Sequence, residues 1–107
     1  MMADMTERPF ASSLLAGKTA LVTGGGTGLG RAIAEGLSGA GADVVIAARR
    51  KERLDVAAAE ISAATGNPVD VDLVDIRDRS TIEALAGRHD VDILVNNAGG
   101  QFPQKAR

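Results

Sequence analysis

The sequence predicts an α/β fold, a doubly wound parallel sheet with helices on both of its faces. Three observations support this prediction. Short apolar runs alternate along the chain with segments of helical periodicity, a pattern that indicates βαβ units with right-handed crossovers. The connections between these segments are short, and the first is rich in glycine. The 107 residues, of which 45% are hydrophobic and 24% charged, have the length and composition of one globular domain.

The first strand and the first helix flank the glycine-rich connection. Thr19–Thr23 (TALVT) is a short apolar run bounded by glycine, which is typical of a buried strand. The segment from Gly28 to about Gly39 is expected to be helical, because its apolar residues recur on one helical face. Those residues are Leu29, Ala32, Ile33 and Leu37. Asp43–Ala48 (DVVIAA) is apolar and β-branched, and it predicts the second strand.

The next helix and strand repeat the pattern. A helix is expected from Lys51 to about Thr65, where Gly66 ends it. Its apolar stripe consists of Leu54, Ala57, Ala58 and Ile61. Val69–Val74 alternates as V-D-V-D-L-V and predicts the third strand.

One more helix and strand complete the order βαβαβαβ. Asp78 or Ser80 is expected to cap a helix that runs to about Arg88. Ser80-Thr81-Ile82-Glu83 fits the capping box, in which the Ser and Glu side chains bind free amides at the helix start. Asp92–Val95 (DILV) predicts the fourth strand.

Composition excludes several classes of function. The net charge of −2 and the presence of only two aromatic residues, both Phe, argue against nucleic-acid binding. Without Cys there are no disulfides, thiolate metal sites or Cys nucleophiles. The single His, His89, cannot form a zinc site alone, so no metal is expected.

The N-terminal segment, residues 1–17, is predicted to be an irregular lead-in. Three of its apolar residues are expected to pack as a patch: Phe10, Leu14 and Leu15. It lacks the basic region and apolar core of a secretory signal. No apolar run in the chain approaches the roughly 20 residues that span a membrane, so a cytoplasmic protein without membrane contact is expected.

Five glycines fall between Gly24 and Gly30, where a strand leads into a helix. A helix N-terminus carries unpaired amides and a partial positive charge, and glycine allows both a positive φ and a close approach to the backbone. We therefore expect Gly24, Gly28 and Gly30 to surround a diphosphate. Thr23 and Thr27 are expected to donate hydroxyl hydrogen bonds to it.

Three other interpretations of this turn are disfavoured by the sequence. A merely flexible loop is disfavoured by its place at a strand-to-helix junction. The P-loop pattern fits the spacing of Gly25 and Gly30, but Arg31-Ala32 stands where Lys and Ser/Thr are needed, so an NTPase is disfavoured. The G-x-G-x-x-G pattern fits in no register.

The spacing T-G-x-x-x-G-x-G over Thr23–Gly30 resembles the cofactor motif of the short-chain dehydrogenase/reductase family. Asn96-Asn97-Ala98-Gly99 resembles a second family motif, and Val74-Asp75-Ile76 matches the family's Asp after the third strand. The resemblance extends over Gly17–Gly99, the N-terminal half of a typical member. It implies the N-terminal half of a Rossmann-type sheet with strand order 3-2-1-4, so that residues 18–107 form an incomplete NAD(P)-binding domain.

The resemblance also implies a set of cofactor-binding residues. These are Thr23, Gly24, Thr27, Gly28, Leu29, Gly30, Asp75, Ile76, Asn96, Asn97 and Gly99. Ligands of doubly wound sheets bind beyond the carboxyl ends of the strands, where these segments converge. The Asp75 carboxylate would accept from the adenine amino group, although a helix-capping role is the alternative. Asn96 and Asn97 would contact the adenosine ribose and also tie the sheet together.

The end of the second strand indicates which cofactor is preferred. An acidic residue there binds the ribose 2′-hydroxyl of NAD, whereas Arg accommodates the 2′-phosphate of NADP. Here Ala48 stands in the acidic position and Arg49 follows it. Arg binds phosphate with two parallel hydrogen bonds. We therefore expect NADP(H) rather than NAD(H), with Arg49 as the main phosphate ligand and Arg50 and Lys51 as secondary candidates.

The sequence offers no residues for the catalytic step. The resemblance implies hydride transfer to or from a carbonyl, alcohol or enoyl thioester, on a small-molecule substrate and in a homo-oligomer. The family's Tyr-x-x-x-Lys pair lies beyond the fourth strand, and the sequence has no Tyr, so no catalytic residue is assigned. The chain is expected to be the inactive N-terminal part of a reductase; the alternative is a stand-alone, non-catalytic nucleotide-binding half-domain. The turn at Gly99–Pro103 resembles the enoyl-CoA and dienoyl-CoA reductase branch.

Overall fold

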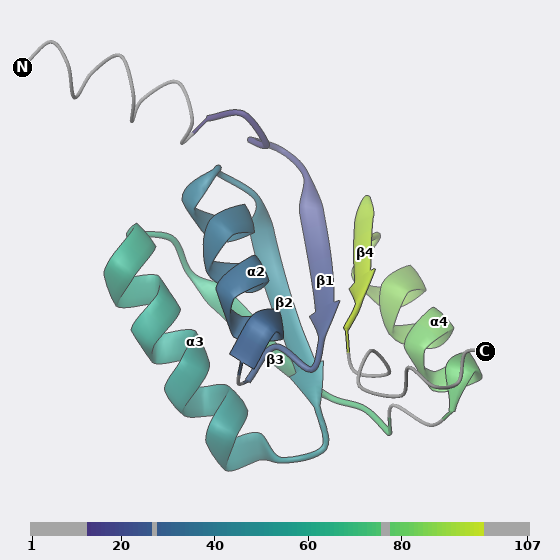
Figure 1. The fold of residues 1–107 in the computed structure, drawn as a ribbon. Helices are drawn as coiled ribbons and strands as arrows, with labels where there is room; N and C mark the ends of the chain where they lie inside the picture. The colour runs from purple at the N-terminus through teal and green to yellow at the C-terminus, as the bar shows by residue number, and fades with distance from the viewer. Residues whose placement is uncertain (1–12, 27, 76–77, 98–107) are drawn as a thin grey trace, which may run out of the picture.

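A computed structural model describes residues 13–26, 28–75 and 78–97 of the chain. Its four strands form one parallel sheet in the order β3-β2-β1-β4, as predicted (Figure 1). The elements are β1 (Thr19–Thr23), α2 (Gly28–Gly39), β2 (Asp43–Ala48), α3 (Lys51–Thr65), β3 (Val69–Leu73), α4 (Arg79–Arg88) and β4 (Ile93–Asn96). All seven elements agree with the sequence prediction to within about a residue at each end.

Helices cover both faces of the sheet, α2 and α3 on one and α4 on the other (Figure 1). The central strands β1 and β2 are apolar without interruption because both of their faces are buried. One cluster joins alternate residues of these strands, such as Val22 and Ile46, to Leu54 and Ile61 of α3. The other cluster lies on the opposite face, where Leu21 of β1 packs with Ile82 and Leu85 of α4.

The face that α2 buries differs from the predicted one. Its buried residues are Gly30, Ala34 and Ser38, whereas Leu29 of the predicted apolar stripe is 68% exposed. Ile33 and Leu37 of that stripe are half-buried, and Ala32 is exposed. Small residues spaced four apart bring the helix backbone close to its neighbours, and this close approach decides which face is covered.

Helix α3 buries the predicted stripe: Leu54, Ala57, Ala58 and Ile61. Gly66 ends the helix in the left-handed conformation, with φ of 80°, and its N–H donates to the Ser62 carbonyl. The ends of α2 and α3 are joined by a 2.8 Å hydrogen bond between the hydroxyls of Ser38 and Thr65. The Asn67 side-chain amide donates to the Ser38 carbonyl over 2.8 Å, so the far end of the helix pair is fixed.

Asp78 is the N-cap of α4, which decides between the two predicted caps. Its carboxylate accepts from the backbone N–H of Ser80 at 3.0 Å and from the Ser80 hydroxyl at 2.6 Å. Hydrogen bonds from Ser80 and Thr81 lower the pKa of the Asp78 carboxyl. The capping box that starts at Ser80 is therefore wrong, because Ser80 already lies inside the first turn of the helix.

The outer strands differ slightly from their predicted bounds. β3 ends at Leu73, although the Val74 N–H still donates to the Ala48 carbonyl of β2 over 3.0 Å. β4 begins at Ile93, after Asp92 has paired with β1 through two bonds to the Thr19 backbone.

Of the predicted N-terminal patch, only Leu14 and Leu15 lie among the described residues, and residues 13–17 form turns. Leu14 is 69% exposed, while Leu15 packs against the core and its N–H donates to the Ala40 carbonyl over 2.8 Å. Phe10 lies outside the described residues. Within the described ranges, no helix has the length and apolar character needed to cross a membrane.

Candidate nucleotide-binding site

The glycine turn lies at the carboxyl ends of the strands, between β1 and α2 (Figure 1). Gly24 and Gly28 have φ values of 72° and 60°, in the region that only glycine enters without strain. The Gly24 N–H donates to the Ala47 carbonyl over 2.8 Å, which ties the turn to the end of β2. The sequence therefore needs glycine here for the conformation of the backbone.

Two further glycines are required by close packing. A Cβ on Gly30 would lie 2.1 Å from the Gly24 carbonyl oxygen and 2.7 Å from Nδ2 of Asn97. A Cβ on Gly25 would lie 2.6 Å from Cγ2 of Ile46. By contrast, a Cβ on Gly28 would meet no described atom within 4 Å. The space beside Gly28 is therefore the open part of the turn, where a ligand can approach the backbone.

Thr23 serves the protein interior rather than the open side of the turn. It is fully buried, and its hydroxyl donates to Oδ1 of Asn96 over 2.8 Å. The bond joins the ends of β1 and β4, so Asn96 ties the sheet together as expected. The hydroxyl contact from Thr23 to a diphosphate stays a prediction.

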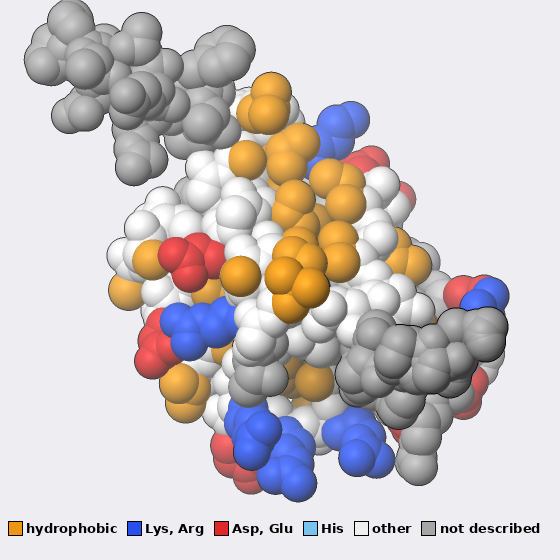
Figure 2. Space-filling model, viewed as in Figure 1, with side chains coloured by type: hydrophobic (Ala, Val, Ile, Leu, Met, Phe, Trp, Pro, Cys, Tyr) orange, Lys and Arg blue, Asp and Glu red, His pale blue; other side chains and the backbone are white. Residues whose placement is uncertain are grey.

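A basic pocket opens beside the glycine turn, at the end of β2. Its lining consists of Gly24, Gly26, Ala48, Arg49, Arg50, Arg53 and Leu54. Figure 2 shows Lys and Arg side chains gathered at this edge of the molecule. The structure thus brings Arg49 and Gly24 into one pocket together with Arg53, which was not among the residues predicted for the site.

A second pocket adjoins the first and shares Arg49 with it. The other residues that line it are Leu73, Val74, Asp75 and Thr81. Asp75 is therefore brought to the same edge of the sheet as the glycine turn. The helix-capping role weighed for Asp75 is filled by Asp78.

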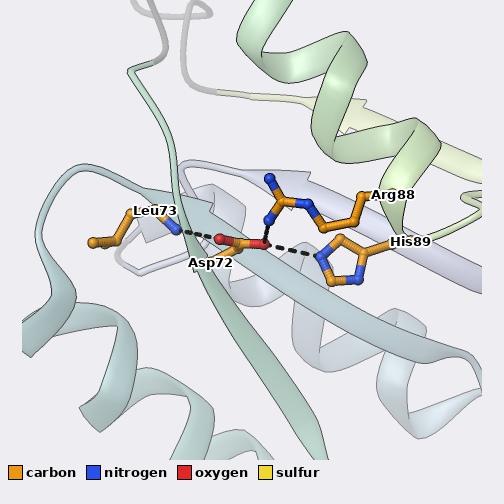
Figure 3. A network of polar contacts seen from close by, with 4 residues as sticks. All are labelled: Asp72, Leu73, Arg88 and His89. Atoms are coloured by element: carbon orange, nitrogen blue, oxygen red, sulfur yellow. Dashed lines mark hydrogen bonds and ion pairs between the residues drawn. The ribbon is translucent and has the colours of Figure 1, made fainter.

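A network of polar contacts joins the C-terminal end of α4 to β3 (Figure 3). Oδ2 of Asp72 lies 2.8 Å from the Arg88 guanidinium and 3.0 Å from Nε2 of His89. Oδ1 accepts from the Leu73 N–H at 2.9 Å. The hydrogen bond with His89, supported by Leu73 and Arg88, lowers the pKa of the Asp72 carboxyl, although burial opposes this.

Apart from Thr23 and Asn96, which bond to each other, the predicted site residues fall into three groups. Gly24, Arg49 and Asp75 line the two adjoining pockets. Gly28 and Leu29 are exposed at the start of α2, and Gly30 packs against Gly24 and Asn97. Thr27, Ile76 and Gly99 lie outside the described residues. No three His, Cys, Asp or Glu side chains of the described residues are grouped to hold a metal ion.

A parallel sheet with a glycine turn and a basic pocket at the carboxyl ends of its strands defines a nucleotide-binding α/β protein of the Rossmann type. The chain belongs to the short-chain dehydrogenase family of oxidoreductases, whose family model matches residues 18–107. A probable 2,4-dienoyl-CoA reductase of Caenorhabditis elegans is 48% identical over 95 residues, 82% of this chain and 30% of that protein.

Two solved structures show how the chain relates to complete proteins. L-sorbose reductase from Gluconobacter frateurii, in complex with NADPH and L-sorbose, matches with a TM-score of 0.72 and 36% identity over 82% of this chain and 35% of its own. A 3-oxoacyl-(acyl-carrier-protein) reductase from Agrobacterium tumefaciens with NADP bound has a TM-score of 0.69 and 34% identity, covering 83% and 36%. The chain spans about a third of the length of these relatives.

Proposed function

We propose that this chain is the NADP(H)-binding portion of a short-chain dehydrogenase/reductase. One observation carries the proposal: the open side of the glycine turn, a basic pocket and an Asp-lined pocket adjoin at one edge of the sheet. In this arrangement the amides at the start of α2 bind the diphosphate. Arg49 binds the 2′-phosphate, and Asp75 accepts from the adenine amino group. We further propose that Asn97, whose side chain packs against Gly30, contacts the adenosine ribose.

The preference for NADP over NAD follows from the end of β2. An NAD site needs a carboxylate that accepts from the ribose 2′-hydroxyl, and Ala48 offers none. The guanidinium of Arg49 supplies the charge that a phosphate needs. The NADPH and NADP bound in the two related reductases support the same choice.

The reaction proposed for the whole protein is hydride transfer to or from a carbonyl, alcohol or enoyl thioester. When bound, NADPH would supply the hydride in one direction of the reaction, and NADP⁺ would accept it in the other. The sequence Gly99–Pro103, which lies outside the described residues, and the dienoyl-CoA reductase relative favour an enoyl thioester. Because the sequence has no Tyr for the family's acid/base pair, we propose that these 107 residues alone bind nucleotide without turnover.

The alternative is a stand-alone, non-catalytic nucleotide-binding half-domain. Reading the coding DNA past codon 107 separates the two. A continuing frame that encodes a Ser followed by Tyr-x-x-x-Lys supports the reductase, whereas a stop codon with expressed product supports the half-domain. Homo-oligomerisation and a cytoplasmic location remain proposals for the complete protein.

Amide NMR of the labelled chain tests the nucleotide site directly. On addition of NADP⁺ we expect the largest shifts at Gly24, Gly26, Arg49 and Val74, which line the two adjoining pockets. Gly66 and Asn67, at the far end of α3, serve as internal controls and should not move. Shifts confined to that far end, or no shifts at saturating nucleotide, would contradict the proposed site.

A further inference from the structure

The first turn of α3 concentrates positive charge where it is unfavourable. Four of the five residues from Arg49 to Arg53 are basic, and Glu52 is the acidic residue of the turn. The N-cap residue is Arg50, which makes no side-chain capping bond. Because a helix N-terminus already carries partial positive charge, these cations lower the stability of the helix. Such a cost indicates that some of them serve a ligand.

The cations differ in whether a carboxylate neutralises them. Nζ of Lys51 lies 2.7 Å from Oδ2 of Asp55, one turn along the helix. Arg31 of α2 pairs with Glu60 of α3. Within the described ranges, no ion pair connects Arg49, Arg50 or Arg53 to a carboxylate. Lys51 is therefore neutralised by a carboxylate, whereas the three arginines that line the basic pocket are not.

Arg53 holds a particular position among these arginines. A Cβ on Gly26 would lie 3.7 Å from the Cβ of Arg53 and 3.7 Å from Cδ2 of the buried Leu54. The stem of Arg53 is therefore packed over the glycine turn. Its side chain lines the basic pocket and also the groove beside it, which includes Arg31, Glu52 and Val56. Arg53 thus lines the basic pocket together with residues of the glycine turn and of the end of β2.

Arg49 occupies a different position, because it lines both the basic pocket and the pocket that contains Asp75. A phosphate monoester carries a charge of about −1.5 to −2 near neutral pH, which is more than one guanidinium neutralises. Arg53 lines the same pocket as Arg49, so a second guanidinium is available to the phosphate there.

We propose that Arg53 is a specificity-determining residue that binds the 2′-phosphate of NADP(H) together with Arg49. The inference rests on the proposed function and deepens it, since it assigns the discrimination between NADP and NAD to a residue of α3 as well as to the end of β2. Arg53 supplies charge and hydrogen bonds to the phosphate and takes no part in chemistry at the nicotinamide.

Two adenosine nucleotides test the inference without the rest of the cofactor. Adenosine 2′,5′-bisphosphate carries the 2′-phosphate and 5′-AMP lacks it. Their dissociation constants are measured by amide NMR titration of the chain and of Arg53→Ala. We expect Arg53→Ala to weaken binding of the bisphosphate by about ten- to a hundredfold, because one charge-assisted contact is lost. Binding of 5′-AMP should weaken by less than about threefold.

Arg88→Ala is the matched control, because it removes one arginine that already pairs with Asp72 and lines neither of the two adjoining pockets. It should change both affinities by less than about threefold. Arg53→Lys should recover only part of the loss, since an ammonium lacks the paired donors of the guanidinium. Thermal unfolding of Arg53→Ala should occur at the same temperature as the wild type or higher, because a cation has left the helix N-terminus.

The outcomes separate this inference from the proposed function. A wild-type chain that prefers the bisphosphate, with an Arg53→Ala variant that retains its affinity or loses affinity equally for both nucleotides, overturns the inference alone. A wild-type chain that binds neither nucleotide, or binds both equally, overturns the proposed NADP site and the role of Arg53 with it.

Discussion

The hydroxyl of Thr23 donates a 2.8 Å hydrogen bond to Oδ1 of Asn96, across 73 residues of sequence. Thr23 is the last residue of β1 and Asn96 is the last residue of β4, which pair in register. The glycine turn follows the first of these residues, and Asn97 follows the second. The bond therefore fixes the two segments on which the site is built relative to one another.

Replacement of Thr23 by Val tests this relationship. The variant keeps the shape of the side chain and loses the donor, so we expect the free energy of unfolding to fall by about 0.5–1.5 kcal/mol. Urea denaturation followed by circular dichroism measures it. Thr23→Ser, which keeps the hydroxyl, is the control. In a double-mutant cycle with Asn96→Ala, strictly additive effects would show that the bond contributes nothing to stability.

Gly30 and Gly36 form a matched pair on α2. A Cβ on Gly30 would meet the Gly24 carbonyl oxygen at 2.1 Å, so Gly30→Ala must displace the glycine turn and should destabilise by about 1–3 kcal/mol. A Cβ on Gly36 meets nothing within 4 Å, so Gly36→Ala should stabilise the helix by roughly 0.5–1 kcal/mol. Thermal denaturation distinguishes the two. Equal effects would mean that the helix does not approach the turn so closely.

Gly28 links backbone conformation to binding. With φ of 60°, Gly28→Val should cost roughly 1–2 kcal/mol of stability, and its side chain would fill the open space beside the turn. Calorimetric titration should then detect no binding of NADP⁺. Gly66→Ala introduces similar strain at φ of 80° in the remote cap of α3 and should retain binding. Unchanged affinity in Gly28→Val would show that the diphosphate binds elsewhere.

Asp72 predicts how acid affects stability. Its contacts with His89, Leu73 and Arg88 hold the pKa of its carboxyl below the ordinary value of 3.8. A carboxyl with a lowered folded pKa stabilises the protein above its unfolded pKa, and this contribution is lost as the pH falls through the folded pKa. The free energy of unfolding of the wild type should therefore exceed that of Asp72→Asn by about 0.2–1 kcal/mol near neutral pH. That difference should close below pH 3.8.

Urea denaturation at several pH values measures this difference. Asp70→Asn, at an exposed Asp of the same strand, is the control and should follow the wild type at each pH. A stability difference between wild type and Asp72→Asn that stays constant from neutral to acid pH would contradict the role assigned to the network.

The sequence was sufficient to predict the elements, the sheet order and the place of the glycine turn. These features depend on local periodicity, on glycine at strand-to-helix junctions and on motif spacing. It was not sufficient to predict the buried face of α2. Periodicity favours the side with the larger apolar residues, whereas the contact between Gly30 and Gly24 places the small residues inward.

The residues of the candidate site were predicted only in part, because some of their positions depend on contacts between distant segments. Gly24, Arg49 and Asp75 follow from strand ends, and the structure brings them to two adjoining pockets. The buried donor role of Thr23 depends on a partner 73 residues away. The position of Arg53 depends on how α3 packs on Gly26, and neither relationship is visible in a local pattern.

The relative affinity for NADPH and NADH tests the central claim most directly. Isothermal titration of the wild-type chain with each cofactor should give at least about tenfold tighter binding of NADPH, because the end of β2 offers Arg49 and no carboxylate. Arg49→Ala should weaken the binding of NADPH by about ten- to a hundredfold and leave the affinity for NADH nearly unchanged. Equal affinities of the wild type for the two cofactors would contradict the account.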